Sequence, residues 1–167
     1  MNCYKETNKN NDSYESYNYE LSNTYPKKIG ELKKGGYVCI NNRPCKIIEY
    51  SSMKNGKHGH CKVTIVAIDL FSKKKIEYSQ PASSNIDIPT VLRSEYFLLS
   101  VNEEEYCELK NLKSGEIRCD IKLPKDTLED QSCSKAIKNS VAEGKPIMVV
   151  LISAMNISKI VDYVNCK

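Results

Sequence analysis

The residues best suited to chemistry lie together in residues 51–62, which read Ser-Ser-Met-Lys-Asn-Gly-Lys-His-Gly-His-Cys-Lys. The stretch has no acidic side chain, and its primary amines are those of Lys54, Lys57 and Lys62. A lysine amine is a nucleophile when it is neutral and a phosphate-binding cation when it is charged. The composition therefore indicates a covalent modification site, a polyanion-binding site, or both.

Two glycines, Gly56 and Gly59, enclose Lys57 within this stretch. Glycine readily adopts the positive φ of a tight hairpin tip, so the spacing predicts a turn that leaves the Lys57 side chain exposed. Strand-like apolar runs at 45–50 and 61–68 predict the two strands of a long hairpin. We therefore expect an exposed tip on a well-anchored support.

The neighbouring residues His58, His60 and Cys61 are possible metal ligands. A single short cluster with no second half elsewhere in the sequence does not define a zinc site, so we predict no metal. The two histidines have two interpretations. Either they add positive charge beside Lys57, or they satisfy backbone groups within the turn.

The run 56–60, with Lys54 before it and Lys62 after it, resembles the hypusine loop of the eukaryotic translation initiation factor 5A family. The resemblance covers about residues 24–167. Met53 departs from the family pattern, which more often has a small polar residue there, and Cys61 stands where the family often has alanine. Further matching segments lie at 42–47, 68–71, 87–89, 115–118 and 151–155.

This resemblance implies that Lys57 is converted to hypusine by NAD-dependent transfer of an aminobutyl group from spermidine, followed by hydroxylation. It implies that Lys54, Gly56, His58, Gly59 and His60 form the loop that presents it. The implied partners are deoxyhypusine synthase and deoxyhypusine hydroxylase.

The resemblance also implies a translation factor that binds ribosomal RNA near the exit site and contacts peptidyl-tRNA. Such a factor promotes peptide-bond formation at stalled sequences, and also termination. It would not be an enzyme and would bind no cofactor, because the sequence contains no recognisable nucleophile–base set, Walker loop or catalytic carboxylate pair. A homodimer is possible.

The elements that must position the loop are predicted to be mainly β. Residues 1–25 are rich in asparagine and tyrosine and poor in aliphatic side chains, which predicts a disordered arm. Short strands separated by glycine, asparagine and polar turns over 26–89 predict a small barrel, which the resemblance identifies as SH3-like.

Residues 90–167 are predicted to form an OB-fold, with three strands, one helix from 128 to 142, and two further strands. Thr127 is a candidate N-cap for that helix. The apolar residues of 157–164 have helical spacing, but an OB-fold requires a fifth strand there, so we predict a strand. A domain boundary is expected near Pro89 and Thr90.

The positive charge is concentrated in the segment that contains the lysine loop. Residues 26–89 carry twelve basic and five acidic side chains, whereas residues 90–167 carry eleven basic and twelve acidic ones. A small basic domain attracts polyanions such as RNA. The residues predicted to contact RNA are Lys33, Lys34, Arg43, Lys54 and Lys62.

The chain has neither an apolar run long enough to span a membrane nor the apolar core of a signal peptide, which favours a cytoplasmic protein. The eight cysteines are therefore expected to be free thiols.

Two other classes of function stay open. The same two-barrel fold could serve a self-assembling structural protein, although such a protein would not need an intact loop with Lys57. It could also serve as a generic single-strand RNA-binding module, although these usually carry stacking aromatic side chains on the OB-fold.

Overall fold

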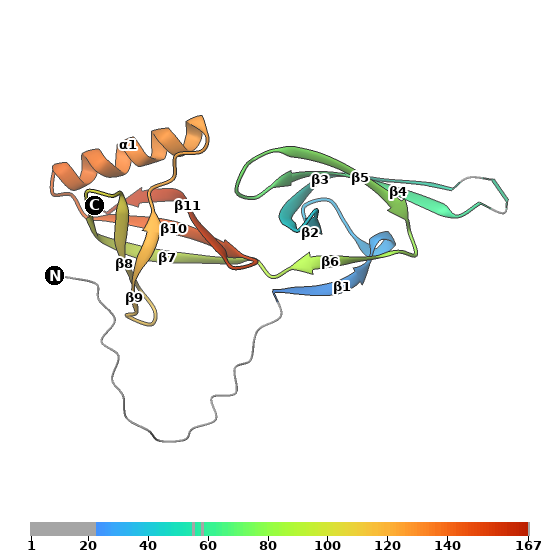
Figure 1. Ribbon diagram of the computed structural model, residues 1–167, viewed down its shortest axis with the longest axis horizontal. Helices are drawn as coiled ribbons and strands as arrows, with labels where there is room; N and C mark the ends of the chain where they lie inside the picture. Colours follow the sequence, from blue (N-terminus) through green and yellow to red (C-terminus); the bar gives the residue numbers. More distant parts are fainter. Residues whose placement is uncertain (1–22, 55, 58, 167) are drawn as a thin grey trace, which may run out of the picture.

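The computed structural model describes residues 23–54, 56–57 and 59–166. These residues form two mainly β bodies that lie one after the other along the long axis of the molecule (Figure 1). The predicted disordered arm falls almost entirely outside the described residues. No helix in the described part of the chain is long and apolar enough to cross a membrane.

The first body contains a four-stranded antiparallel sheet in the order β2-β3-β4-β5 and a two-stranded ribbon formed by β1 and β6. Side chains along β4 alternate between buried and more exposed, and Val63, Ile65 and Ala67 reach the core. The elements are β1 (Thr24–Lys28), the 3-10 helix η1 (Ile29–Glu31), β2 (Tyr37–Ile40), β3 (Arg43–Lys54), β4 (Cys61–Asp69), β5 (Lys75–Pro81) and β6 (Asn85–Pro89).

The first strand begins earlier than the sequence predicted. Thr24 and Tyr25 were expected to belong to the disordered arm, but they pair with Pro89 and Ile88 of β6. Pairing with a neighbouring strand, rather than burial, orders these two residues, since the Tyr25 side chain remains about half exposed.

The second body follows the predicted order of an OB-fold. It contains β7 (Leu92–Val101), β8 (Tyr106–Asn111), β9 (Ile117–Lys122), α1 (Leu128–Ala142), β10 (Ile147–Ala154) and β11 (Ile157–Asn165). The sheet order is β11-β10-β7-β8-β9, and contacts between β11 and β9 close the barrel. The predicted cap is present, because the Thr127 hydroxyl accepts from the Asp130 amide and the Asp130 carboxylate accepts from the Thr127 amide.

The structure explains why residues 157–164 have helical spacing and yet form a strand. Val150 pairs with Asp162 and the next residue, Leu151, pairs with Ile160, so Val161 is an extra residue in β11. A β-bulge of this kind shifts the alternation of side chains by one residue. The apolar positions therefore depart from period two although the segment is a strand, as predicted.

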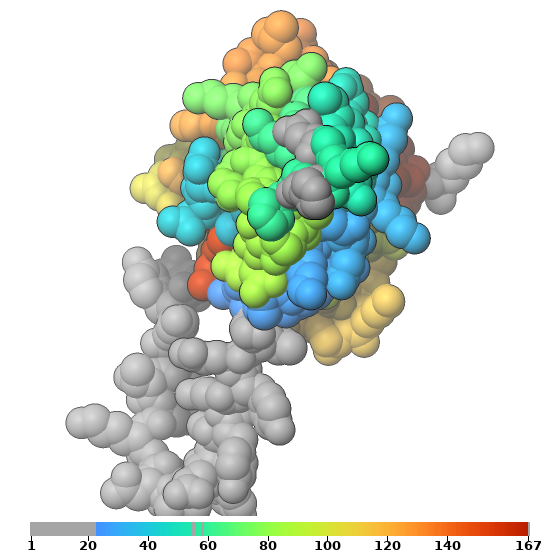
Figure 2. Space-filling model, turned by 90° about the vertical axis from the view of Figure 1, so that its right-hand side faces the viewer, coloured from blue at the N-terminus to red at the C-terminus, as the bar shows by residue number. Residues whose placement is uncertain are grey.

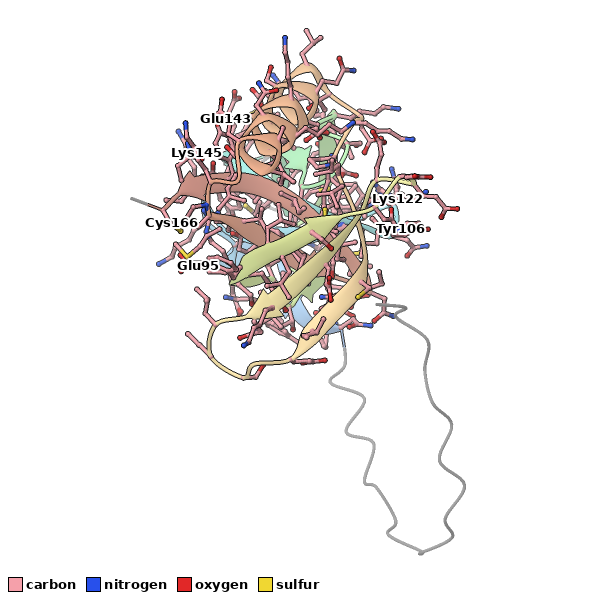
Figure 3. All side chains as sticks on the ribbon, turned by 90° about the vertical axis from the view of Figure 1, so that its left-hand side faces the viewer. Glu95, Tyr106, Lys122, Glu143, Lys145 and Cys166 are labelled. Atoms are coloured by element: carbon pink, nitrogen blue, oxygen red, sulfur yellow. The ribbon has the colours of Figure 1, made fainter. Side chains whose placement is uncertain are left out.

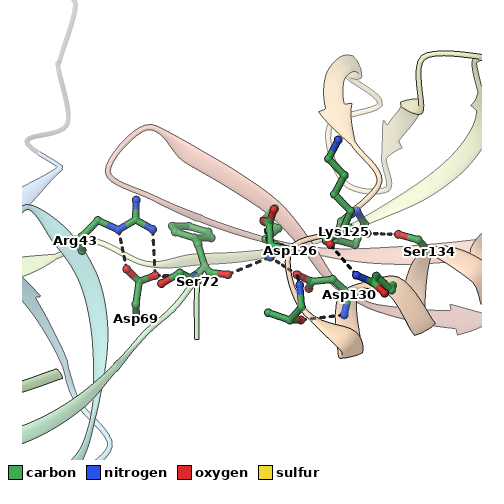
Figure 4. Close-up of polar contacts among 12 residues, drawn as sticks. Arg43, Asp69, Ser72, Lys125, Asp126, Asp130 and Ser134 are labelled. Carbon is green, nitrogen blue, oxygen red and sulfur yellow. Dashed lines mark hydrogen bonds and ion pairs between the residues drawn. The ribbon is translucent and has the colours of Figure 1, made fainter. Parts of the chain in front are cut away.

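The two bodies are joined by an ion cluster centred on Lys159 of β11, which binds the carboxylates of Asp126 and Asp130 that are labelled in Figure 4. Its ammonium donates to the Asp130 carboxylate at 2.5 Å, to the Asp126 carboxylate at 3.2 Å, and to the backbone carbonyl of Phe71 at 3.0 Å. Phe71 belongs to the turn after β4, so one side chain connects the second body to the first. Leu70 and Phe71 also pack with Ala154 of β10 in a small apolar cluster.

Asp69 holds that turn in shape. Its buried carboxylate accepts from the amides of Phe71 and Ser72 at 2.8 and 2.9 Å and from the Arg43 guanidinium at 2.7 and 3.3 Å. Burial alone raises the pKa of Asp69, but the Arg43 guanidinium and the two amides outweigh it and hold the pKa below its usual value. The folded protein therefore favours the ionised form of Asp69.

The expectation of free thiols is confirmed for six cysteines, namely 39, 45, 61, 107, 133 and 166. It is wrong for Cys119, which is disulfide-bonded. Cys3 lies outside the described residues.

Replacing Lys159 by methionine should lower the free energy of unfolding strongly. The substitution leaves the Asp130 carboxylate, which is only 9% exposed, without its cation, and loss of one partner of a buried pair costs about 3 kcal/mol. The matched control is Lys145→Met. Its ion pair with Glu143 is largely exposed (Figure 3), so its loss should cost under about 1 kcal/mol. Equal losses in urea titrations would contradict the structural role of Lys159.

Asp69→Asn should lower stability at neutral pH and weaken its dependence on pH in acid. The folded pKa of Asp69 is depressed, so its contribution is complete above the unfolded value of about 3.9 and disappears as pH falls through the folded value. Urea unfolding at pH 7 and at pH 2 measures the effect. The variant should differ from the parent clearly at pH 7 and little at pH 2, and a difference of the same size at both values would disprove it.

Candidate functional site

The lysine-rich stretch forms the outer end of the β3–β4 hairpin, which projects from the first body (Figure 1). The two strands remain paired as far as Lys54 and Cys61, so the tip lies between these two residues. From Ser51 to Lys54 every side chain is exposed, whereas Val63, Ile65 and Ala67 are buried. The hairpin is therefore anchored in the core at its base and surrounded by solvent at its end.

Backbone hydrogen bonds support the hairpin close to the tip. The carbonyl of Cys61 accepts from the amide of Ala82 at 2.7 Å, and the carbonyl of Ala82 accepts from the amide of Gly30 at 3.0 Å. The Tyr50 hydroxyl donates to the carbonyl of Gly30 at 3.3 Å. Glycine suits this close approach between Gly30 and Ala82, because a Cβ on Gly30 would lie 3.0 Å from the Ala82 carbonyl oxygen and would force the neighbouring backbone to shift.

The tip itself has the predicted backbone at Gly56, whose φ is +68°. Nothing lies within 4 Å of the position that a Cβ would occupy there. Lys57 and His60 are exposed and Gly59 is partly buried, whereas Asn55 and His58 are outside the described residues. Seen end-on in Figure 2, the hairpin faces away from the body of the molecule.

The hairpin brings together three of the lysines singled out in the sequence. Lys54 and Lys62 are exposed beside Lys57, and no acidic residue lies between positions 50 and 68. Lys33 and Lys34 are also exposed, but they belong to a separate turn before β2. The end of the hairpin thus has three lysines and no acidic residue in the sequence to offset their charge.

Arg43 lies elsewhere. It is at the start of β3, about 35 Å along an extended strand from Lys54, and its guanidinium is bound to Asp69. Neither this pairing nor the contacts of Lys159 were predicted from the sequence. Asp69 did carry a local signal, since an aspartate often caps the amides two and three residues later.

In chemical terms the site offers an exposed primary amine on a rigid support. Among the described residues, no group of three His, Cys, Asp or Glu side chains could hold a metal ion. The Lys57 side chain is exposed, so its amine is accessible to a modifying enzyme or to a phosphate. His60 lies close to it in sequence but has no hydrogen-bond partner that defines its role among these residues.

The fold and the site define a two-domain factor in which an SH3-like barrel presents an exposed lysine and an OB-fold follows. Residues 22–84 match the family model described as "Translation initiation factor 5A-like, N-terminal", and residues 90–163 match "Eukaryotic elongation factor 5A hypusine, DNA-binding OB fold". The chain belongs to the eukaryotic translation initiation factor 5A family, whose members are translation factors with a hypusine modification.

Individual relatives agree with this assignment. The chain is 43% identical to eukaryotic translation initiation factor 5A-1 of Arabidopsis thaliana over 142 residues, which cover 85% of this chain and 87% of that protein. It superposes on a family member from Naegleria fowleri with a TM-score of 0.80 and 44% identity, over 85% of this chain and 99% of the other. A 5A factor from Methanococcus jannaschii gives a TM-score of 0.64 at 26% identity, over 86% and 97% of the two chains.

Gly56→Ala should strain the tip without creating a steric clash. A left-handed backbone costs a residue with a Cβ about 1 kcal/mol, and the surrounding space is open. We therefore expect a loss of roughly 1 kcal/mol in the free energy of unfolding, measured by urea titration. Gly56→Asn is the matched control, since asparagine tolerates positive φ, and should lose less than half as much. Equal losses for the two variants would show that the positive φ of residue 56 does not determine the cost of replacing Gly56.

Proposed function

We propose that this chain acts on the ribosome near the exit site, and that Lys57, once converted to hypusine, promotes peptide-bond formation at stalled sequences and during termination. The observation that carries the proposal is the exposed side chain of Lys57 at the end of a braced hairpin that has no acidic residue between positions 50 and 68. Of the residues predicted to contact RNA, Lys54 and Lys62 support it best because they flank Lys57 on the same hairpin.

The modification requires an accessible amine. Deoxyhypusine synthase would transfer an aminobutyl group from spermidine to the Lys57 nitrogen, and deoxyhypusine hydroxylase would then add the hydroxyl. The tip is exposed and narrow, so both enzymes can reach the amine while the strands remain paired as far as Lys54 and Cys61.

The lengthened side chain would have two amines and a hydroxyl on a thin stem. These groups donate hydrogen bonds to phosphate and ribose oxygens and fit where a protein loop would not. Contact with the acceptor end of peptidyl-tRNA would restrict its motion and favour the reactive geometry. The contribution to the ribosome's reaction is then one of positioning, which lowers the entropic part of the barrier.

Lys57→Arg separates modification from simple charge. Arginine keeps the positive charge and binds phosphate well, but it does not accept the aminobutyl group. The variant should remain folded and gain no mass when it is incubated with the synthase, spermidine and NAD. Runs of consecutive prolines, which stall the ribosome, should be translated no faster with the variant than without any factor. Intact-mass analysis and a reconstituted translation assay measure the two effects.

Lys54→Arg is the internal control because it lies in the same hairpin and keeps the same charge. It should still gain mass at Lys57 and support translation. Normal activity of the Lys57→Arg protein would disprove the proposal, whereas failure of both variants would point to damage to the hairpin.

A further inference from the structure

The second body is near neutral in net charge, yet it has a local excess of lysine on one side. Lys125, Lys135 and Lys138 line a pocket of about 360 Å³ between α1 and the turn that joins β7 to β8. Lys122 extends beside this turn, with its ammonium 4.4 Å from the centre of the Tyr106 ring (Figure 3). The near-neutral net charge of the domain gives no indication of this local cluster of lysines.

Four of the residues that line the pocket lie in a row along α1. Gln131, Lys135, Lys138 and Asn139 follow one another at intervals of four, three and one residues, which places them on the same side of α1. Ile137 and Ser140 of the same helix are buried against the barrel. From Gln131 to Asn139 the row is about 12 Å long and consists of cationic and amide groups.

One acid lines the pocket. Glu105 accepts from Lys138 at 2.5 Å, and its pKa is lowered first by Lys138 and then by the charges of Lys125 and Lys122. Glu103 and Glu104 are in the same turn but do not line the pocket, and Asp126 is bound by Lys159. In the described part of the chain, Lys125 and Lys135 form no ion pair, so the pocket has a surplus of positive charge.

We propose that this pocket binds the phosphodiester backbone of RNA, at a place separate from the Lys57 hairpin. Lysine ammoniums spaced along a helix suit a row of phosphates, and the amides of Gln131 and Asn139 can donate to sugar and phosphate oxygens. An acidic peptide would meet the same charges, but Pro124 is the single apolar residue that lines the pocket, and the pocket is not lined by the aromatic side chains that usually anchor protein partners.

The site differs from the surface with which OB-folds commonly bind oligonucleotides. That surface is formed by the second and third strands, which are β8 and β9 here. The pocket lies instead on the helix side, and α1 is at the opposite end of the molecule from the β3–β4 hairpin (Figure 1). Binding RNA at both ends would fix the orientation of the factor on a large RNA surface.

The test uses the unmodified full chain with Lys54, Lys57 and Lys62 replaced by alanine, so that neither the hairpin nor hypusine contributes. The probe is a fluorescein-labelled RNA hairpin, and fluorescence polarisation gives Kd over a series of KCl concentrations. Lys125→Ala with Lys135→Ala is compared with Lys27→Ala with Lys28→Ala. The second pair removes the same charge from exposed positions on β1, in the first body and away from both the pocket and the β8–β9 surface.

We expect the pocket variant to weaken binding at least fivefold and to reduce the slope of log K against log salt by between 1 and 2, roughly one unit for each phosphate that is no longer neutralised. The control pair should change Kd by less than twofold. Glu105→Gln removes the acid of the pocket and should tighten binding about threefold, since the net charge of the site rises by one.

Equal effects of the two double variants would overturn the proposal, because net charge alone would then account for binding. An unchanged or weaker Kd for Glu105→Gln would also overturn it. Tighter binding of a labelled decaglutamate peptide than of the RNA, with the same dependence on Lys125 and Lys135, would replace RNA by an acidic protein as the partner. None of these outcomes depends on whether Lys57 is modified.

Discussion

The arrangement of the two domains depends on one buried ammonium. Lys159 lies between the carboxylates of Asp126 and Asp130 and the carbonyl of Phe71, and it is only 11% exposed. An ammonium in such a place loses much of its hydration, and hydrogen bonds to oxygen atoms offset that loss. Two of its three partners belong to the OB-fold, but the third belongs to the first barrel, in the turn that Asp69 holds in shape. The relative position of the domains therefore determines whether Lys159 has all three partners.

The hairpin uses a different means to obtain rigidity. Its base is packed in the core, and the hydrogen bonds that link Cys61 to Ala82 and Ala82 to Gly30 continue the support almost to the tip. A lysine on a long free loop would lose much backbone entropy when it is held against a substrate, whereas the strands up to Lys54 and Cys61 have already lost theirs on folding. The tip can thus be exposed and polar, as modification requires, while the strands restrict the region in which Lys57 lies.

Local sequence patterns were enough to predict the hairpin, the order of elements in the OB-fold and the capped helix, because strand periodicity, glycine turns and Thr127 act over a few residues. Even β11 could be predicted from the needs of the fold, although its bulge at Val161 disguised the alternation. Arg43 and Asp69 are 26 residues apart, and Lys159 and Phe71 are 88 apart. Such pairs are determined by tertiary packing, and nothing in their local sequence identifies the partner. The lysines around Glu105 were missed for a related reason, since a net charge summed over a domain contains no information on where the charges lie.

The contacts between the two bodies affect how the ends of the molecule could act together. A second site on a tethered group benefits from a high effective concentration only if the spacing of the two sites matches the spacing of their targets. The hydrogen bond from Lys159 to the Phe71 carbonyl and the packing of Leu70 and Phe71 with Ala154 restrict the separations that the hairpin and the α1 pocket can adopt, so binding at one end favours binding at the other. A looser junction would leave each site intact, but binding at the second site would then lose additional orientational entropy. The buried ion cluster borders the α1 pocket, because Asp126 follows Lys125 and Asp130 precedes Gln131 in the sequence, and it contacts the first body through Phe71.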